Sequence, residues 1–241
     1  MNQRPVTTAA DQALIDRLRT PRMTSEHVYS GGGGVMATRI RSMLPGARII
    51  GRALTVRTLP GFTRKTLEAL SLAKAGDVLV VAAGGPSEMS PWGGVAHWNA
   101  TREKLGGVIV DGPTRDLTEI QSLEGAIPLF AVGQAPAIAG FGTPSVGTIG
   151  DTVICGGVSV STGDLIFADD DGIAVVPWAK AGEIVHLAEQ SIVFDDKEQQ
   201  WVESGRSIFD MLVMLSGADG SQYKQRKFRW VAQAGIEPLA D

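Results

Sequence analysis

The sequence contains one cysteine, Cys155, so no disulfide can form within the chain. Because Cys155 ends the apolar run 153–155, the pattern favours a buried structural thiol over a nucleophile. No uninterrupted apolar stretch approaches membrane-spanning length, and the first residues show no signal-peptide pattern. These absences predict a cytoplasmic protein without a membrane partner.

Positive charge is also scarce. The chain has 22 Lys and Arg residues against 26 Asp and Glu residues, which gives a net charge of −4 and a pI near 5.4. A surface that binds nucleic acid needs clustered positive charge, and this composition offers no such signal. We therefore expect no nucleic-acid partner.

Three common kinds of ligand site are missing from the sequence. No pair among its three histidines has metal-ligand spacing, which argues against a zinc site. The glycine run 31–34 does not follow a strand as dinucleotide binding requires, and there is no Gly-Lys-Ser or Gly-Lys-Thr step. The acidic run 169–171 lacks the spacing and terminal Glu of an EF-hand loop, so we interpret it as a solvated turn.

What is present is a series of short apolar runs separated by glycine, which predicts a β-rich α/β domain. A chain of 241 residues can bury one substantial core as a single domain. Helical segments fall between several early strands, whereas strand follows strand after Pro136. We predict strands at 49–50, 53–56, 78–82, 108–110, 129–131, 152–154, 158–160, 165–168 and 173–176. We predict helices at 11–18, 66–73, 95–105, 117–122, 179–192 and 199–214.

The segment 107–116 carries the strongest chemical signal. Its apolar part, 108–110, is typical of a strand buried on both faces, and the Gly112-Pro113 step after it predicts a turn. Arg115 and Asp116 then lie at the mouth of a loop. The Arg fork can bind a substrate carboxylate bidentately, while the neighbouring carboxylate can anchor a divalent cation. Alternatively, residues 116–119 have capping-box spacing, so that Asp116 caps the helix 117–122; both roles can coexist.

A glycine-rich segment forms a second candidate wall of the site. Gly93 and Gly94 would let the backbone approach a ligand closely, and the amides of Val95 and Ala96 open the helix 95–105. These groups suit the carboxylate of a 2-oxo acid, with Arg115 as the other clamp. The alternative is an ordinary glycine-rich turn between a strand and a helix.

His97 is a weaker candidate for catalysis. It follows Gly94 by three residues, so on a helix it could face the same pocket and exchange a proton there. The alternative is an incidental histidine on the helix surface.

Several separated motifs, in order, resemble the signature of the RraA-like family. They are residues 51–56, 75–81, 92–96, 107–116, and 163–164 followed by 169–177, within a resemblance that covers roughly residues 20–215. The family includes class II pyruvate aldolases acting on 4-hydroxy-4-methyl-2-oxoglutarate and 4-carboxy-4-hydroxy-2-oxoadipate, with oxaloacetate decarboxylase activity, and also regulators of ribonuclease E.

The resemblance implies a fold and an assembly. The expected fold is α/β, a single β/β/α three-layer domain of the RraA-like, swivelling phosphohistidine-domain type. It would span residues 1–216 including an N-terminal helix, with a C-terminal extension at 217–241. The family assembles as homotrimers or homohexamers with active sites between subunits, and we expect the same here. Because the extension mixes basic with aromatic residues, we predict that it packs on a neighbouring subunit.

The resemblance also assigns roles, with one departure. The metal ligand of the family corresponds to Asp116 and its substrate-binding arginine to Arg115. Family aldolases carry an acidic residue after the glycine of the Trp-Gly step, where it hydrogen-bonds metal-bound water, but this chain has Gly94 there. The departure predicts an altered substrate or reaction.

The resulting hypothesis is a divalent-metal-dependent carbon–carbon lyase, an aldolase or decarboxylase acting on a 2-oxo acid. Mg²⁺ or Mn²⁺ at Asp116 would chelate the substrate and stabilise a pyruvate enolate, while Arg115 neutralises its oxygen or carboxylate. Decarboxylation needs no base at a hydroxyl, so it should tolerate Gly94 better than aldol cleavage does. Two alternatives remain: a regulator acting by protein contact, and a metal-dependent hydrolase or lyase for another carboxylic acid.

Overall fold

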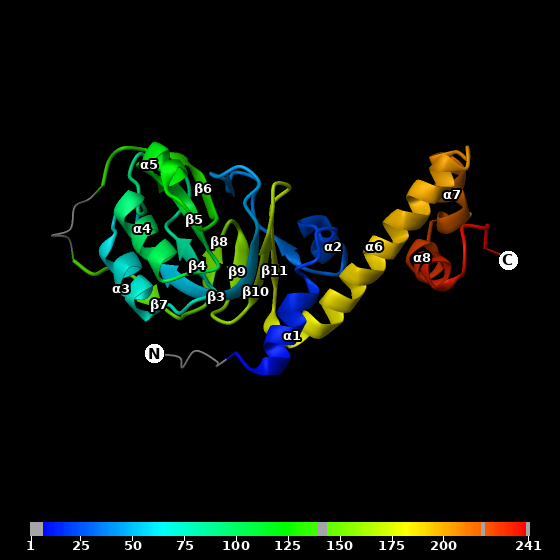
Figure 1. The fold of residues 1–241 in the computed structure, drawn as a ribbon, viewed down its shortest axis with the longest axis horizontal. Coiled ribbons are helices and arrows are strands. Elements are labelled where there is room, and N and C mark those ends of the chain that lie inside the picture. Colours follow the sequence, from blue (N-terminus) through cyan, green and yellow to red (C-terminus); the bar gives the residue numbers. More distant parts are fainter. Residues whose placement is uncertain (1–6, 139–143, 218–219, 240–241) are drawn as a thin grey trace.

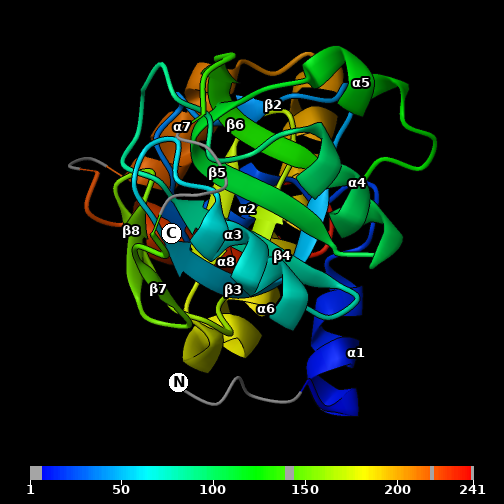
Figure 2. The ribbon, with the colours of Figure 1, turned by 90° about the vertical axis from the view of Figure 1, so that its left-hand side faces the viewer.

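A mixed sheet lies between a β-hairpin and a layer of helices in the computed structural model, which describes residues 7–138, 144–217 and 220–239. Helices α3, α4 and α5 cover one face of the sheet (Figures 1 and 2). The hairpin of β8 and β9 packs on the opposite face. This layering confirms the predicted α/β fold of the β/β/α type.

The elements follow the chain in an order that places the parallel strands early and the antiparallel ones late. The helices are α1 (Ala9–Arg17), α2 (Ser25–Ser30), α3 (Arg64–Leu72), α4 (Gly94–Arg102), α5 (Leu117–Ser122), α6 (Ala181–Glu203), α7 (Ile208–Ser216) and α8 (Tyr223–Ala232), with a 3₁₀ turn at Trp178–Lys180. The strands are β1 (Gly34–Val35), β2 (Arg41–Ser42), β3 (Ile49–Arg57), β4 (Asp77–Ala82), β5 (Gly107–Thr114), β6 (Leu129–Gln134), β7 (Thr148–Ile149), β8 (Val153–Cys155), β9 (Val158–Val160), β10 (Leu165–Ala168) and β11 (Ile173–Val176).

The main sheet has the strand order β1-β11-β10-β3-β4-β5-β6-β2, with β7 paired to β3. Strands β3 to β6 run parallel to one another, and the remaining pairs are antiparallel. Side chains alternate between the two faces, since Val78 and Val80 face the hairpin while Leu79 and Val81 face the helices. Both faces of β4 are therefore buried, which explains its continuous apolar sequence.

A third core lies on the antiparallel part of the sheet, on the face of β10 and β11 that points away from the hairpin. Leu165, Phe167, Ala174 and Val176 of β10 and β11 pack against apolar residues of α1, α2 and α6. Gly31 belongs to this packing, because a Cβ there would lie 2.7 Å from a backbone oxygen of α6. A residue with a side chain would therefore not fit at this position.

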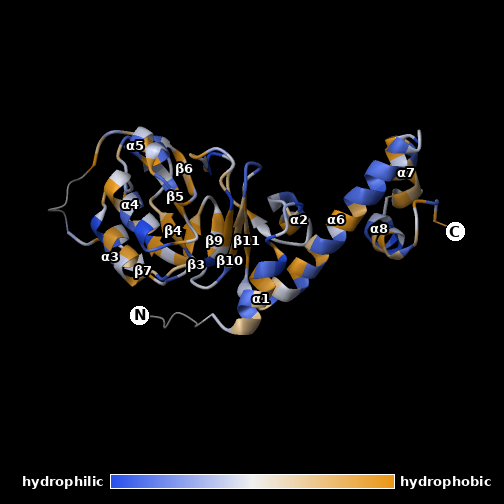
Figure 3. Cartoon of the chain, viewed as in Figure 1, coloured by the Kyte–Doolittle hydropathy of each residue, from blue (hydrophilic) through white to orange (hydrophobic). Residues whose placement is uncertain are grey.

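Helix α6 has 23 residues and extends away from the sheet, with α7 and α8 at its far end (Figure 1). These helices bury a separate apolar cluster around Trp230, and α7 is strongly apolar (Figure 3). The Trp230 ring centroid lies 5.8 Å from that of Phe194 and 6.0 Å from that of Trp201. We call this group of helices, from Phe194 onward, the C-terminal lobe.

The strand β5 differs from its prediction in a way that matters for the site. It runs through Gly112 and Pro113 to Thr114, whereas the sequence predicted a turn at that step. The pairing with β6 shifts register between Val110 and Pro113, and an irregular register is where a proline fits a strand without losing a ladder hydrogen bond. The strand therefore delivers Arg115 and Asp116 directly at its end.

Candidate functional site

Two chain segments about twenty residues apart meet at the end of β5. Trp92 and Thr114 form a parallel bridge, and the Arg115 N–H donates to the Trp92 carbonyl at 3.2 Å. Helix α4 begins at Gly94, and α5 begins after Asp116. The N-terminal ends of both helices, with their unpaired amides, are thus brought to one place.

The side chain of Asp116 joins these two segments. Its Oδ2 atom accepts hydrogen bonds from the Gly94 N–H at 3.1 Å and from Arg115 Nε at 3.2 Å. Asp116 has φ 59° and ψ 32°, a left-handed conformation that is uncommon for a residue with a Cβ. Strained backbone of this kind persists where the surroundings over-determine it, and such residues cluster at functional sites.

The capping-box prediction is wrong. Asp116 occupies the position before α5, but its side chain makes no capping hydrogen bond to that helix. Its carboxylate instead turns toward α4 and Arg115, with the side chain 39% exposed and that of Arg115 21% exposed. Both charged groups are therefore accessible to a small molecule.

Gly93 and Gly94 allow the close approach. A Cβ at Gly93 would lie 2.8 Å from Arg115 Cγ and 3.0 Å from Asp116 Oδ2. A Cβ at Gly94 would lie 2.9 Å from Glu119 Oε2 and 3.2 Å from Asp116 Cβ. The contacts shorter than 3.0 Å are closer than real Cβ atoms approach, so a residue with a Cβ at either position would make Arg115 or Glu119 move.

The sequence analysis missed Glu119 as a site residue. It lies in the first turn of α5, is exposed, and directs its carboxylate at the Cα side of Gly94. Its spacing from Asp116 was visible in the sequence, but the capping-box interpretation used that spacing for helix capping. The side chains of Asp116 and Glu119 thus both lie close to the position that a Cβ on Gly94 would occupy.

The remaining predicted residues of α4 divide into two groups. Val95 is 67% exposed and Ala96 is half-buried, and both belong to the first turn, beside Arg115 and Asp116. His97 is 0% exposed and points into the core, where its Nδ1 receives a 3.4 Å contact from Trp92 Nε1. Burial lowers the pKa of His97 to about 4, so its ring is neutral and has no access to the site.

Few side chains at this place could hold the predicted divalent cation. Among the described residues, no group of three or more His, Cys, Asp and Glu side chains could hold a metal. Mg²⁺ and Mn²⁺ keep several water ligands and need only one or two carboxylates, whereas a structural zinc site needs about four protein ligands. Asp116, with Glu119 near the same position beside Gly94, fits a Mg²⁺ or Mn²⁺ site and does not fit a structural zinc site.

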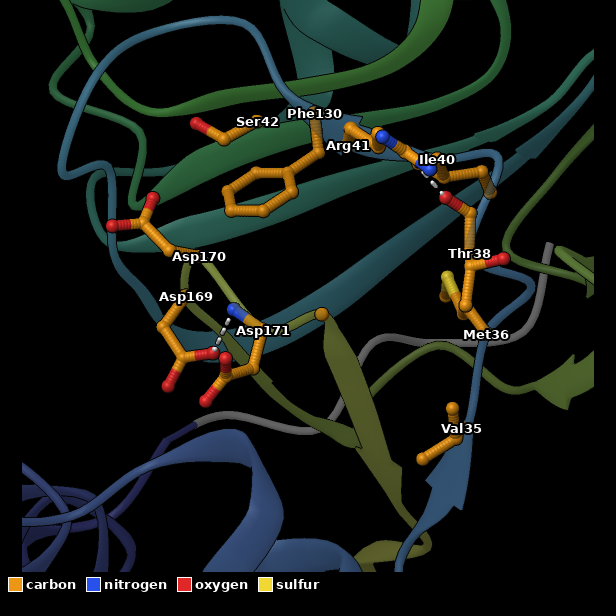
Figure 4. A pocket seen from close by; sticks show the side chains of 11 residues that line it. Val35, Met36, Thr38, Ile40, Arg41, Ser42, Phe130, Asp169, Asp170 and Asp171 are labelled. Atoms are coloured by element: carbon orange, nitrogen blue, oxygen red, sulfur yellow. Dashed lines mark hydrogen bonds between the residues drawn. The ribbon is translucent and has the colours of Figure 1, made fainter.

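Apart from the residues at the end of β5, a hollow of about 420 Å³ lies near the turn between β10 and β11 (Figure 4). Asp169, Asp170 and Asp171 approach it from that turn, and Phe130 and Arg41 from other strands. Asp169 accepts hydrogen bonds from the Ser25 N–H and Oγ at 2.8 and 2.6 Å, so it holds α2 in place. Asp170 and Asp171 are exposed, in agreement with a solvated turn.

Cys155 is buried, as predicted, and burial raises the pKa of its thiol. His27 is also a structural residue: its ring contacts Thr24 at the start of α2 and Asp195 of α6 at 2.8 Å. No helix in the described part of the chain is both long enough and apolar enough to cross a membrane.

Comparison with known proteins shows the family of the chain and agrees with the fold. The family model described as RraA-like, Aldolase/RraA, matches residues 13–175, so the chain belongs to the RraA-like family. A protein of Halalkalibacterium halodurans, provisionally named 4-hydroxy-4-methyl-2-oxoglutarate aldolase, is 28% identical over 191 residues, covering 79% of this chain and 89% of that protein. The 4-hydroxy-4-methyl-2-oxoglutarate aldolase of Thermus thermophilus is 32% identical over 139 residues, covering 56% and 80%.

A solved structure shows the regulatory side of the family. RraAS2 of Streptomyces coelicolor, described as an unusual member of the RNase ES inhibitor RraA protein family, is 29% identical with a TM-score of 0.65. The match covers 84% of this chain and 98% of RraAS2. The family therefore includes proteins named as aldolases and proteins described as inhibitors. These names do not distinguish an enzyme from a regulator, so the choice rests on the residues of the candidate site.

Proposed function

We propose that the protein is a carbon–carbon lyase that acts on a 2-oxo acid with the help of Mg²⁺ or Mn²⁺. The observation that carries the proposal is the shared Asp116 Oδ2 atom, which fixes Arg115 and the start of α4 side by side. A guanidinium and the amides of a helix N-terminus are both groups that bind a carboxylate. The names of two relatives, both 4-hydroxy-4-methyl-2-oxoglutarate aldolases, agree with this class.

Each residue has a role that follows from its position. Asp116 would hold the cation, while Arg115 would bind the substrate carboxylate or the oxygen on which negative charge develops. The amides of Val95 and Ala96 face the same anion from the start of α4, next to the Gly94 N–H that is bonded to Asp116. The cation, when bound, supplies Lewis acidity worth several kcal/mol at the 2-oxo group.

The position of Gly94 decides which reactions suit the site best. Gly94 itself offers no side chain that could exchange a proton with a substrate hydroxyl. Decarboxylation of an oxaloacetate-like acid requires no such exchange, because the leaving group is CO₂ and not a carbonyl formed from an alcohol. We therefore expect decarboxylase activity to be less affected by Gly94 than aldolase activity.

A regulatory role is the second candidate, favoured by the description of RraAS2 as a member of an inhibitor family. A protein that acts only by contact has no chemical need for an exposed Arg115–Asp116 pair with strained backbone. That pair makes the enzyme the better-supported proposal.

The test is pyruvate release from oxaloacetate and from 4-hydroxy-2-oxo acids, with Mg²⁺, with Mn²⁺ and with EDTA. Asp116→Asn keeps the side-chain size and tolerates the left-handed backbone, and Arg115→Gln removes the guanidinium. We expect each to lower metal-dependent turnover by about 100-fold or more, a loss of roughly 3 kcal/mol in transition-state stabilisation. Asp170→Asn and Arg64→Gln, at exposed positions away from the site, serve as matched controls.

Unfolding midpoints of the four variants separate chemistry from folding. Full activity of Asp116→Asn, or undiminished activity in EDTA, would show that the proposed function is wrong.

A further inference from the structure

A groove of about 390 Å³ opens beside the Arg115–Asp116 pair, between α4 and α5. It is lined by Gly94, Trp98, Glu119, Ile120, Ser122 and Leu123. Gly94 belongs both to this groove and to the site, because its N–H is bonded to Asp116. We call it the α4–α5 groove. A molecule held at Arg115 and Asp116 can extend into it without crossing another element.

The walls of the α4–α5 groove are mostly apolar. Trp98 lies one helical turn after Gly94, and its side chain is 63% exposed. Ile120 and Leu123 of α5 line the groove as well, with Ile120 buried against the core. An indole left in water beside other apolar groups gains free energy when an apolar ligand covers it, at about 25 cal/mol per Å² of surface removed from water.

The charge of the groove is equally informative. Among the described residues that line it, Glu119 is the only ionisable one and Ser122 the only other one with a polar side chain. No Lys or Arg side chain of the described residues lines it. A second substrate carboxylate entering the groove would meet the Glu119 carboxylate, and none of the described side chains that line the groove has a positive charge to neutralise the pair. Two like charges repel near a protein surface.

We infer that the α4–α5 groove binds the part of the substrate remote from its 2-oxo acid end, and that this part is apolar and uncharged. An aryl or branched alkyl group fits the Trp98 wall, whereas a remote second carboxylate that enters the groove, as in 2-oxoglutarate, is rejected by Glu119. The shorter oxaloacetate, whose second carboxylate is the group lost as CO₂, does not need the groove. Trp98 and Glu119 are the specificity-determining residues. The inference rests on the proposed function, since it takes Arg115 and Asp116 as the site of the 2-oxo acid.

The experiment measures binding directly, so that it does not depend on turnover. The probes are pyruvate, phenylpyruvate, 4-methyl-2-oxopentanoate and the dicarboxylate 2-oxoglutarate, titrated calorimetrically into the full-length protein with Mg²⁺. We expect phenylpyruvate to bind at least tenfold more tightly than 2-oxoglutarate. We also expect phenylpyruvate to shift the fluorescence emission of the protein to shorter wavelength, and this shift to be absent in Trp98→Phe.

Variants separate the two residues. Trp98→Ala should weaken phenylpyruvate binding about tenfold and leave pyruvate unchanged. Glu119→Gln should strengthen 2-oxoglutarate binding about tenfold, and Glu119→Lys should reverse the preference. Glu124→Gln, an exposed glutamate outside the groove, is the matched control and should change neither affinity.

Failure of the inference can be told apart from failure of the proposed function. Equal binding of all four acids, or a Glu119→Gln variant with unchanged 2-oxoglutarate affinity, would overturn the inference alone. If phenylpyruvate does not shift the fluorescence emission of Trp98, another surface fills the groove, and this result also overturns the inference. The expected discrimination without any pyruvate release would overturn the lyase and leave the groove assignment standing, and no binding of any 2-oxo acid would overturn both.

Discussion

At the scale of single residues, the candidate site joins Arg115 and Asp116 at the end of β5 to Gly94 at the start of α4, with Glu119 of α5 opposite Gly94. The Arg115–Asp116 pair was predictable from the sequence because the two residues are adjacent and follow a strongly apolar run. Glu119 was not predictable as a site residue, because its place opposite Gly94 depends on how α4 meets α5. His97 illustrates the opposite error. Its helical spacing from Gly94 predicted that it could face the same pocket, but spacing alone does not say which face of a helix is buried.

The burial of His97 predicts a loss of stability in acid. Its pKa in the folded protein is about 4, below the ordinary value near 6.5, so the unfolded chain binds a proton that the folded chain does not. Stability from this residue is present at pH 7 and is lost as the pH falls from about 6.5 to about 4. The shift of roughly 2.5 pH units corresponds to about 3 kcal/mol.

Urea unfolding at pH 7 and pH 4.5 measures this effect. We expect the stability of His97→Asn to depend less steeply on pH than that of the unmodified protein, although the variant is less stable at pH 7. His186→Asn changes an exposed histidine of α6 and should leave the pH dependence unaltered. Parallel pH profiles for all three proteins would mean that His97 does not titrate as its burial implies.

Gly94 and Glu119 form a second pair that variants can separate. The family resemblance alone predicts that Gly94→Asp raises pyruvate release from 4-hydroxy-4-methyl-2-oxoglutarate. In the structure, the new Cβ would lie 2.9 Å from Glu119 Oε2, so the glutamate must move away and two carboxylates then share one place. We expect Gly94→Asp combined with Glu119→Gln to release pyruvate faster than Gly94→Asp alone, with the gain measured by coupled assay. Equal rates would show that Glu119 does not occupy the place of the missing acid.

At the scale of elements, the sequence predicted strands better than helix ends. The strands at 158–160, 165–168 and 173–176 were predicted with the bounds that the structure shows, because each is a short apolar run between turn residues. Helix α6 was predicted to end at Ile192, but it continues to Glu203. The residues between are polar helix formers whose only apolar anchors are Phe194 and Trp201, and these are buried by α7 and α8.

Three short strands and two helices were missed for related reasons. Strands β1, β2 and β7 have two residues each, too few for any alternation to be visible. Helix α2 has six residues, and its start is fixed by Thr24, which makes a reciprocal cap with His27. Helix α8 lies in the segment that we had expected on a neighbouring subunit, and its Trp230 is buried by residues of α6 and α7. Short length hides the strands and α2, whereas long-range packing determines α8.

At the scale of the whole molecule, the position of α8 changes what the extension is expected to do. Trp230 of α8 is fully buried by its own chain, and Lys197 of α6 donates to the carbonyls of Gln233 and Gly235, both at 2.6 Å. The aromatic residue that suggested a subunit contact is thus used within the C-terminal lobe. The boundary at residue 216 and the trimeric or hexameric assembly stay predictions.

Truncation after Ser216 tests the role of the extension in the assembly. Removing residues 217–241 takes away Trp230 and exposes Phe194, Trp201 and Leu215, so the C-terminal lobe should lose most of its order. The sheet should keep its order, because the three cores that pack on it contain none of these residues. We expect hydrogen exchange to quicken in α7 and in the second half of α6 while β4 and β5 stay protected.

Light scattering should give the same number of subunits for both the full-length and the truncated protein, three or six. A drop to monomer on truncation would instead assign the subunit contact to the extension, and a monomeric full-length protein would contradict a site shared between subunits.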